Sequence, residues 1–155
     1  MSTRIWTIQT GGKPLVATAI HDGHTLRDEV AGIMALSEME RLREEDPFTS
    51  KWTAVAETRL IGTHSRFQVD LNRPRDNAVY IEPEDAWGLE VWKRKPSPEL
   101  VKRSLEEYDA FYKAVNQLFS ELQQRFKRFV VFDLHSYNHY RDGIEKPAAD
   151  PAHNP

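Results

Sequence analysis

The pattern of hydrophobic and polar positions predicts a chain of alternating strands and helices. Residues 15–20 and 129–132 are short apolar runs that stop abruptly at polar residues, which is typical of buried parallel strands. Residues 53–60 and 66–71 also fit strands. Between the predicted strands at 15–20 and 53–60, Thr25 with Asp28 three residues later resembles a capping box and predicts a helix that ends before Pro47.

A second, longer helix is predicted after Ser97, a capping residue followed by Pro98 at the first helical position. Apolar residues then recur at alternating spacings of four and three, which gives the helix one apolar face. They are Val101, Leu105, Tyr108, Tyr112, Val115, Phe119, Leu122 and Phe126. A coiled-coil partner would fit this face, but packing on the sheet is favoured because a strand follows at once.

Strand, helix, strands, helix and strand in this order predict an α/β fold, a mostly parallel sheet with flanking helices. Residues 76–97 have no clear period and predict a functional loop or lid. We expect a domain over residues 1–142 and a disordered Pro- and Ala-rich tail over 143–155. No helix follows the last strand, so we expect an incomplete domain. Its open sheet edge would cause homodimerisation or poor solubility.

Composition excludes several classes of function. The 155 residues carry a net charge of −3, which offers no basic field for nucleic acid. No segment is apolar enough to span a membrane or to serve as a signal peptide, so we expect a cytoplasmic protein. There are no cysteines, so a bound metal would need nitrogen and oxygen ligands.

Histidines follow both well-defined apolar runs. His21 and His24 lie in the loop after residues 15–20, where Gly23 permits a turn that aims both rings at one ion. Glu29 is an alternative ligand, although a solvent-exposed carboxylate that stabilises the helix dipole is the simpler interpretation. The alternative for His21 and His24 is a polar loop between strand and helix in which the two histidines bind no metal.

The other run ends at Asp133 and His135, which strand alternation places on one face. A carboxylate beside a histidine can fix its tautomer, so Asp133 is expected to support His135 as a metal ligand. The alternative is a structural hydrogen-bonded pair. His139 is expected to be exposed or to face a substrate, whereas His64 and His153 have no supporting context.

Residues 70–76 hold a possible anchor for a substrate carboxylate. Arg73 could bind it with a bidentate fork and Asn72 could add a neutral donor, on a turn stiffened by Pro74. A surface loop with an internal Asp–Arg pair is an equally good interpretation of the composition.

Taken together, three motifs resemble the N-formylglutamate amidohydrolase family, which is similar in fold to zinc carboxypeptidases and other phosphorylase/hydrolase-like proteins. They are the His-Asp-Gly-His loop, the segment from Ser65 to Pro74, and Asp133-Leu134-His135-Ser136. The resemblance implies one zinc ion held by His21, His24 and His135, and a substrate carboxylate held by Asn72 and Arg73. Ser136 joins this substrate site, and Arg75 or Arg141 would bind a second carboxylate.

The activity implied by this resemblance is hydrolysis of the amide bond of a small N-acyl amino acid such as N-formylglutamate. The carboxypeptidase-type general base is a glutamate downstream of the last histidine. Here only Glu145 follows His135, and nothing in its context suggests that role, so the base is unidentified. The alternative function is a catalytically inactive binding module of the same fold.

Overall fold

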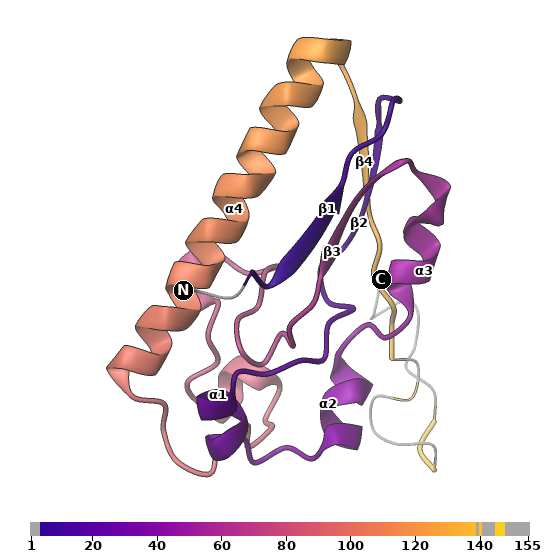
Figure 1. The fold of residues 1–155 in the computed structure, drawn as a ribbon. Coiled ribbons are helices and arrows are strands. Elements are labelled where there is room, and N and C mark those ends of the chain that lie inside the picture. The colour runs from indigo at the N-terminus through magenta and orange to yellow at the C-terminus, as the bar shows by residue number, and fades with distance from the viewer. Residues whose placement is uncertain (1–3, 139, 141–144, 148–155) are drawn as a thin grey trace.

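The computed structural model describes residues 4–138, 140 and 145–147, and within them a four-stranded sheet forms the centre of the fold (Figure 1). Its strands are β1 (Trp6–Gln9), β2 (Leu15–Ala19), β3 (Thr58–Gly62) and β4 (Val130–Asp133), in the spatial order β1-β3-β2-β4. β2 pairs in parallel with both β3 and β4, and β1 pairs antiparallel with β3. The predicted α/β fold with a mostly parallel sheet is confirmed.

Helices lie on both sides of this sheet and beyond one of its ends. The long helix α4 (Pro98–Phe126) crosses one face, while α3 (Thr49–Trp52) lies on the other side (Figure 1). α1 (Asp28–Ile33) and α2 (Glu38–Glu44) lie beyond the carboxyl ends of the parallel strands. The predicted start of α4 is confirmed, because the Ser97 hydroxyl accepts a hydrogen bond from the Leu100 amide at 3.2 Å.

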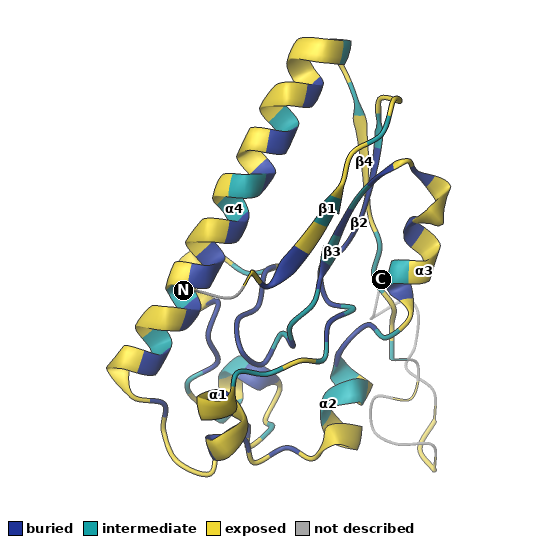
Figure 2. Cartoon of the chain, in the orientation of Figure 1, coloured by how far each residue is buried: buried dark blue, intermediate teal, exposed yellow. Residues whose placement is uncertain are grey.

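Apolar clusters hold these layers together. Between α4 and the sheet, Leu60 of β3 is buried with Phe111 and Val115 of α4, and the buried stripe of α4 is visible in Figure 2. A second cluster below the sheet, which includes Phe67 and Tyr80, packs α1 and the loops against the start of α4. This second cluster supports the loops that follow the strands, and therefore the polar residues they carry.

The predicted strand over residues 66–71 is wrong. Phe67, Val69 and Leu71 are buried, but so are Gln68 and Asp70 between them, so no face of this segment is left for solvent. The Gln68 amide bonds to the Ser65 carbonyl at 3.0 Å and the Asp70 amide to the Ala78 carbonyl at 2.6 Å. The apolar alternation therefore reflects a buried loop that is held by local turns and not by a strand ladder.

Two further boundaries differ from prediction. The helix expected from Thr25 is divided into α1 and α2, because Ser37 starts a new helix with its own capping box to Glu40. The strand expected over 53–60 begins only at Thr58, after a short 3-10 helix over Thr53–Val55. The short edge strand β1 was not predicted. The expected disordered tail over 143–155 lies almost entirely outside the described residues.

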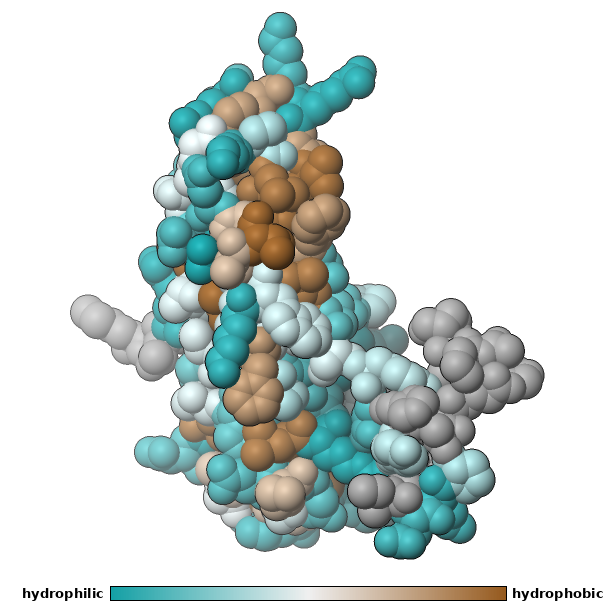
Figure 3. Space-filling view, turned by 90° about the vertical axis from the view of Figure 1, so that its right-hand side faces the viewer, coloured by the Kyte–Doolittle hydropathy of each residue, from teal (hydrophilic) through white to brown (hydrophobic). Residues whose placement is uncertain are grey.

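β4 leaves an apolar edge on the described part of the molecule. The strand pairs with β2 on one side only, and Val130, Val131 and Phe132 are 53%, 36% and 48% exposed. Figure 3, which views this side, shows hydrophobic residues gathered on its upper half. Among the described residues, no helix is both long enough and apolar enough to cross a membrane.

Candidate metal centre

The parallel pairing of β2 and β4 brings His21 and His135 together. Both residues follow the carboxyl end of their strand, and their ring centroids lie 5.1 Å apart. The loop after β2 packs closely on the loop after β3, since a Cβ atom at Gly23 would lie 2.2 Å from the Thr63 carbonyl carbon. Glycine is therefore required at this position by close approach, a reason that differs from the turn expected from the sequence.

Asp46 completes the cluster from the loop between α2 and α3. Ligand atoms of His21, Asp46 and His135 all lie within 4.8 Å of one another. The Asp46 backbone amide bonds to the His21 carbonyl at 3.0 Å, which ties this loop to the end of β2. Two imidazoles and one carboxylate are a donor set found in catalytic zinc sites.

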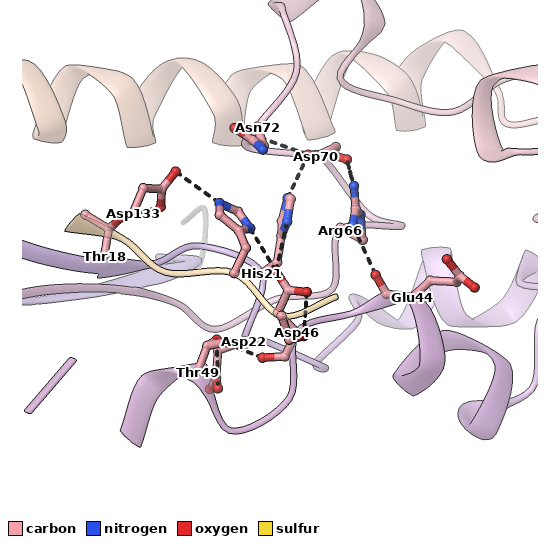
Figure 4. A network of polar contacts seen from close by, with 12 residues as sticks. Thr18, His21, Asp22, Glu44, Asp46, Thr49, Arg66, Asp70, Asn72 and Asp133 are labelled. Carbon is pink, nitrogen blue, oxygen red and sulfur yellow. Dashed lines mark hydrogen bonds and ion pairs between the residues drawn. The ribbon is translucent and has the colours of Figure 1, made fainter. Parts of the chain in front are cut away.

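The orientation of His21 leaves one ring nitrogen available to a metal. Its Nε2 lies 2.8 Å from Asp70 Oδ1, and its Nδ1 lies 3.6 Å from Asp46 Oδ2 (Figure 4). The His21 side chain is only 2% exposed, and its Nδ1 is buried with no hydrogen-bond partner among the described residues. Metal-bound histidines characteristically donate their other ring N–H to a carboxylate. The buried, unpartnered Nδ1 therefore fits a metal ligand.

Asp70 fixes this orientation from a fully buried position. Its Oδ1 accepts from His21 and from the Asn72 amide at 2.8 Å, and its Oδ2 accepts from Arg66 at 2.8 Å and from the Tyr80 hydroxyl. Burial acts to raise the pKa of Asp70, but hydrogen bonds from His21 and the Arg66 charge outweigh it and hold that pKa far below its usual range. Asp70 is therefore a carboxylate anion at neutral pH.

Asp133 holds the second histidine. His135 Nε2 lies 3.0 Å from Asp133 Oδ2 and its Nδ1 lies 2.8 Å from Asp46 Oδ2, while Thr18 of β2 donates to Asp133 Oδ1. The hydrogen bond to Asp133, followed by that to Asp46, raises the pKa of His135 to about 9. Burial acts to raise the pKa of Asp46, but His135, His21 and Ser136 together hold it well below its usual range. A proton on His135 thus compensates the surrounding negative charge, a role that a bound cation can take over.

The structure places His24 and Glu29 away from this cluster. His24 Nδ1 bonds to the buried Glu45, and its Nε2 lies 3.0 Å from Arg41. Glu29 of α1 forms ion pairs with Arg27 and with Arg103 of α4, and so links the two helices. Asp46 occupies the third position of the cluster instead of either residue.

The predicted substrate-binding residues fall into different places. The Ser136 hydroxyl donates to Asp46 Oδ1 at 2.8 Å, directly beside the cluster. The Arg73 guanidinium lies 4.5 Å from the centre of the Tyr80 ring, and Asn72 is exposed. Arg75 forms a bidentate pair with Asp109 on the surface, so it is held away from the site. Arg141, His139 and His153 lie outside the described residues, and Glu145 is exposed.

A pocket of about 290 Å³ opens beside the cluster. Asp46 and Ser136 line it together with Arg66 and Trp87, two residues that sequence reasoning did not select. The Arg66 side chain is held by Asp70, by the Tyr80 hydroxyl at 3.1 Å and by the Glu44 carbonyl at 3.1 Å. These contacts leave one N–H on each terminal nitrogen without an acceptor among the described residues. A fixed guanidinium with free donors in a pocket is suited to bind a carboxylate or a carbonyl oxygen.

The comparisons with known proteins agree with this fold. Residues 13–154 match the N-formylglutamate amidohydrolase family, and the chain belongs to that family. A crystal structure of N-formylglutamate amidohydrolase from Ralstonia eutropha JMP134 is similar, with a TM-score of 0.73 and 19% sequence identity. The match covers 96% of this chain but 65% of that one, so the chain spans less than two thirds of its structural neighbour. No curated protein matches the sequence significantly.

Proposed function

We propose that this chain carries the metal centre of a hydrolase that cleaves the amide bond of a small N-acyl amino acid such as N-formylglutamate. Membership of the family supports the reaction class, and the buried His21 Nδ1 is the observation that carries the metal centre. A nitrogen that is removed from solvent, unpartnered and close to a carboxylate and a second histidine would be costly without a ligand.

The proposed ligands are His21, Asp46 and His135, and the proposed metal is one zinc ion. Three nitrogen and oxygen ligands leave an open position, as catalytic zinc sites require. When bound, the metal would polarise the acyl carbonyl and lower the pKa of a coordinated water to about 7. Asp70 and Asp133 would keep the two imidazoles in the required tautomers, because each accepts a hydrogen bond from the ring nitrogen that does not ligate.

The proposed anchors for the substrate are Arg66 and Arg73. Arg66 lines the pocket at the cluster and is immobilised by the same Asp70 that orients His21. Arg73 Nε lies 3.7 Å from Asp70 Oδ2, so both guanidinium groups are near one point. Together they would hold the substrate's α-carboxylate and direct its amide towards the metal, which is catalysis by proximity. Arg75 is not included, because Asp109 engages it on the surface.

A binding module without catalysis is the second candidate, and one observation favours it. The carboxylates around the cluster are already engaged, Asp70 by four donors and Asp133 by His135 and Thr18. Glu145, the one glutamate after His135, is exposed in a turn. A general base needs a carboxylate within hydrogen-bond reach of the attacking water. Asp46, Asp70 and Asp133 are therefore not free for this role.

Formate release from N-formyl-L-glutamate by the zinc-loaded chain tests the proposal. We expect hydrolysis by the wild type, no hydrolysis by Asp46→Ala, and unchanged hydrolysis by Arg75→Ala, which removes a positive charge outside the site. Zinc binding without hydrolysis would favour the binding module. Loss of activity in Arg75→Ala to the same extent as in Asp46→Ala would contradict the assignment of the site.

A further inference from the structure

The strongest unexplained feature beside the metal centre is Trp87. Its backbone has φ 56° and ψ 27°, in the left-handed region that few non-glycine residues adopt, and Gly88 follows with φ 89°. Trp87 is 44% exposed, and it lines the same pocket as Asp46 and Arg66. A large aromatic side chain that stays exposed on an unusual backbone at a pocket calls for a functional explanation.

The exposure of Trp87 does not come from a loosely held loop. Before it, the Asp85 carboxylate accepts from the Ile81 and Glu82 amides at 2.9 and 3.0 Å, and Ala86 is fully buried. After it, the Gly88 amide bonds to the Pro83 carbonyl at 2.8 Å. The backbone is therefore fixed on both sides of Trp87.

The ring meets two guanidinium groups there. The Arg66 guanidinium carbon lies 5.0 Å from the ring centroid of Trp87 and that of Arg73 lies 5.6 Å away. Both distances are within the range of cation–π interaction, which is strongest for tryptophan. Tyr80 completes the group, since its ring is 6.0 Å from Trp87 and 4.5 Å from the Arg73 guanidinium. Two like charges that share one Asp70 oxygen are thus kept close together by aromatic faces.

We propose that Trp87 is a positioning residue that sets the spacing of Arg66 and Arg73, and so makes the site selective for substrates with a free α-carboxylate. A carboxylate has two oxygens, and two guanidinium groups held side by side can each donate to it. Arg66 is fixed by its own hydrogen bonds, but without the ring Arg73 would keep only the Tyr80 face and an Asp70 oxygen at 3.7 Å, and it could move away from Arg66. This inference rests on the proposed function, because it assigns Trp87 a positioning role at the same substrate site.

The test compares N-formyl-L-glutamate with its α-carboxamide, using the full zinc-loaded chain. For Trp87→Ala we expect kcat/KM on the acid to fall about tenfold, mainly through KM, and on the amide by less than about threefold. Trp87→Phe should recover most of the loss, because phenylalanine keeps an aromatic face. Trp52→Ala is the matched control, because Trp52 is 49% exposed on α3 and should leave both substrates unaffected.

The outcomes separate this inference from the proposed function. If Trp87→Ala loses equal kcat/KM on the acid and on the amide, Trp87 is merely structural and the inference is overturned. If the variant loses no activity, the inference is also overturned. In both cases the proposed function stands, because the wild type hydrolyses the substrate. If the wild type hydrolyses neither substrate, calorimetric binding of N-formyl-L-glutamate decides. If Trp87→Ala weakens binding of the acid about tenfold more than binding of the amide, the inference is supported although the proposed function is not. Absence of binding overturns both.

Discussion

Replacement of Asp70 by asparagine should destabilise the fold more than any other single polar substitution at the site. Oδ1 accepts from His21 Nε2 and the Asn72 amide, and Oδ2 accepts from Arg66 and the Tyr80 hydroxyl. An asparagine side chain carries a donor in place of one oxygen. Either orientation of the new amide therefore sets an NH₂ group against two existing donors.

The magnitude follows from burial. The Asp70 side chain is fully buried and the Arg66 side chain is 14% exposed, so the substitution leaves a largely buried cation without its counter-charge. Removal of one partner from a buried ion pair costs about 3–5 kcal/mol. That is a large part of the roughly 5–15 kcal/mol that keeps a typical domain folded. His21 also loses the group that fixes its tautomer, so zinc affinity should fall about 10- to 100-fold.

Urea unfolding measured with Asp70→Asn and Asp109→Asn checks this prediction. Asp109 also pairs bidentately with an arginine, Arg75, but on the surface, where solvent screens the pair. We expect a large decrease in the free energy of unfolding for Asp70→Asn and a small one for Asp109→Asn, at an unchanged m-value. A change below about 1 kcal/mol for Asp70→Asn would refute the argument from burial.

Three further predictions concern other parts of the molecule. Arg73→Ala should raise KM for N-formyl-L-glutamate with little change in kcat, and an unchanged kcat/KM would remove Arg73 from the substrate site. Phe132→Lys on the open edge of β4 should shift the chain towards monomer in sedimentation velocity, whereas a wild type that is already monomeric would contradict self-association through this edge. Burial raises the pKa of Tyr112 to about 12. Since the folded state keeps that proton longer, the free energy of unfolding should fall from about pH 10 to 12, and less steeply in Tyr112→Phe.

The sequence predicted those parts of the site that follow regular elements. His21 and His135 come directly after apolar runs, and parallel strands necessarily bring their carboxyl ends to one edge. Ser97 and Pro98 likewise marked the start of α4 correctly. In these cases a local signal and the tertiary structure agree.

The remaining parts depend on contacts between distant segments. Asp46 was interpreted as part of a helix end, and its contacts with the distant His21, His135 and Ser136 are what bring it into the cluster. Asp70 was placed in an expected strand, but its amide bonds to the Ala78 carbonyl within a loop, and its buried carboxylate accepts from four residues. A signal was present in the run Glu44-Glu45-Asp46-Pro47, because the residue before a proline is disfavoured in a helix and Asp46 is therefore expected in the loop that follows it. Without the fold, however, that run is equally consistent with a solvated helix end.

Zinc content per chain is the measurement that tests the central claim most directly. Purified wild type, Asp46→Ala, His135→Ala and His24→Ala would be compared by elemental analysis after equilibration with zinc and gel filtration. We predict about one zinc per chain in the wild type and in His24→Ala, and none in Asp46→Ala or His135→Ala. Retention of zinc by Asp46→Ala together with its loss from His24→Ala would contradict the centre formed by His21, Asp46 and His135.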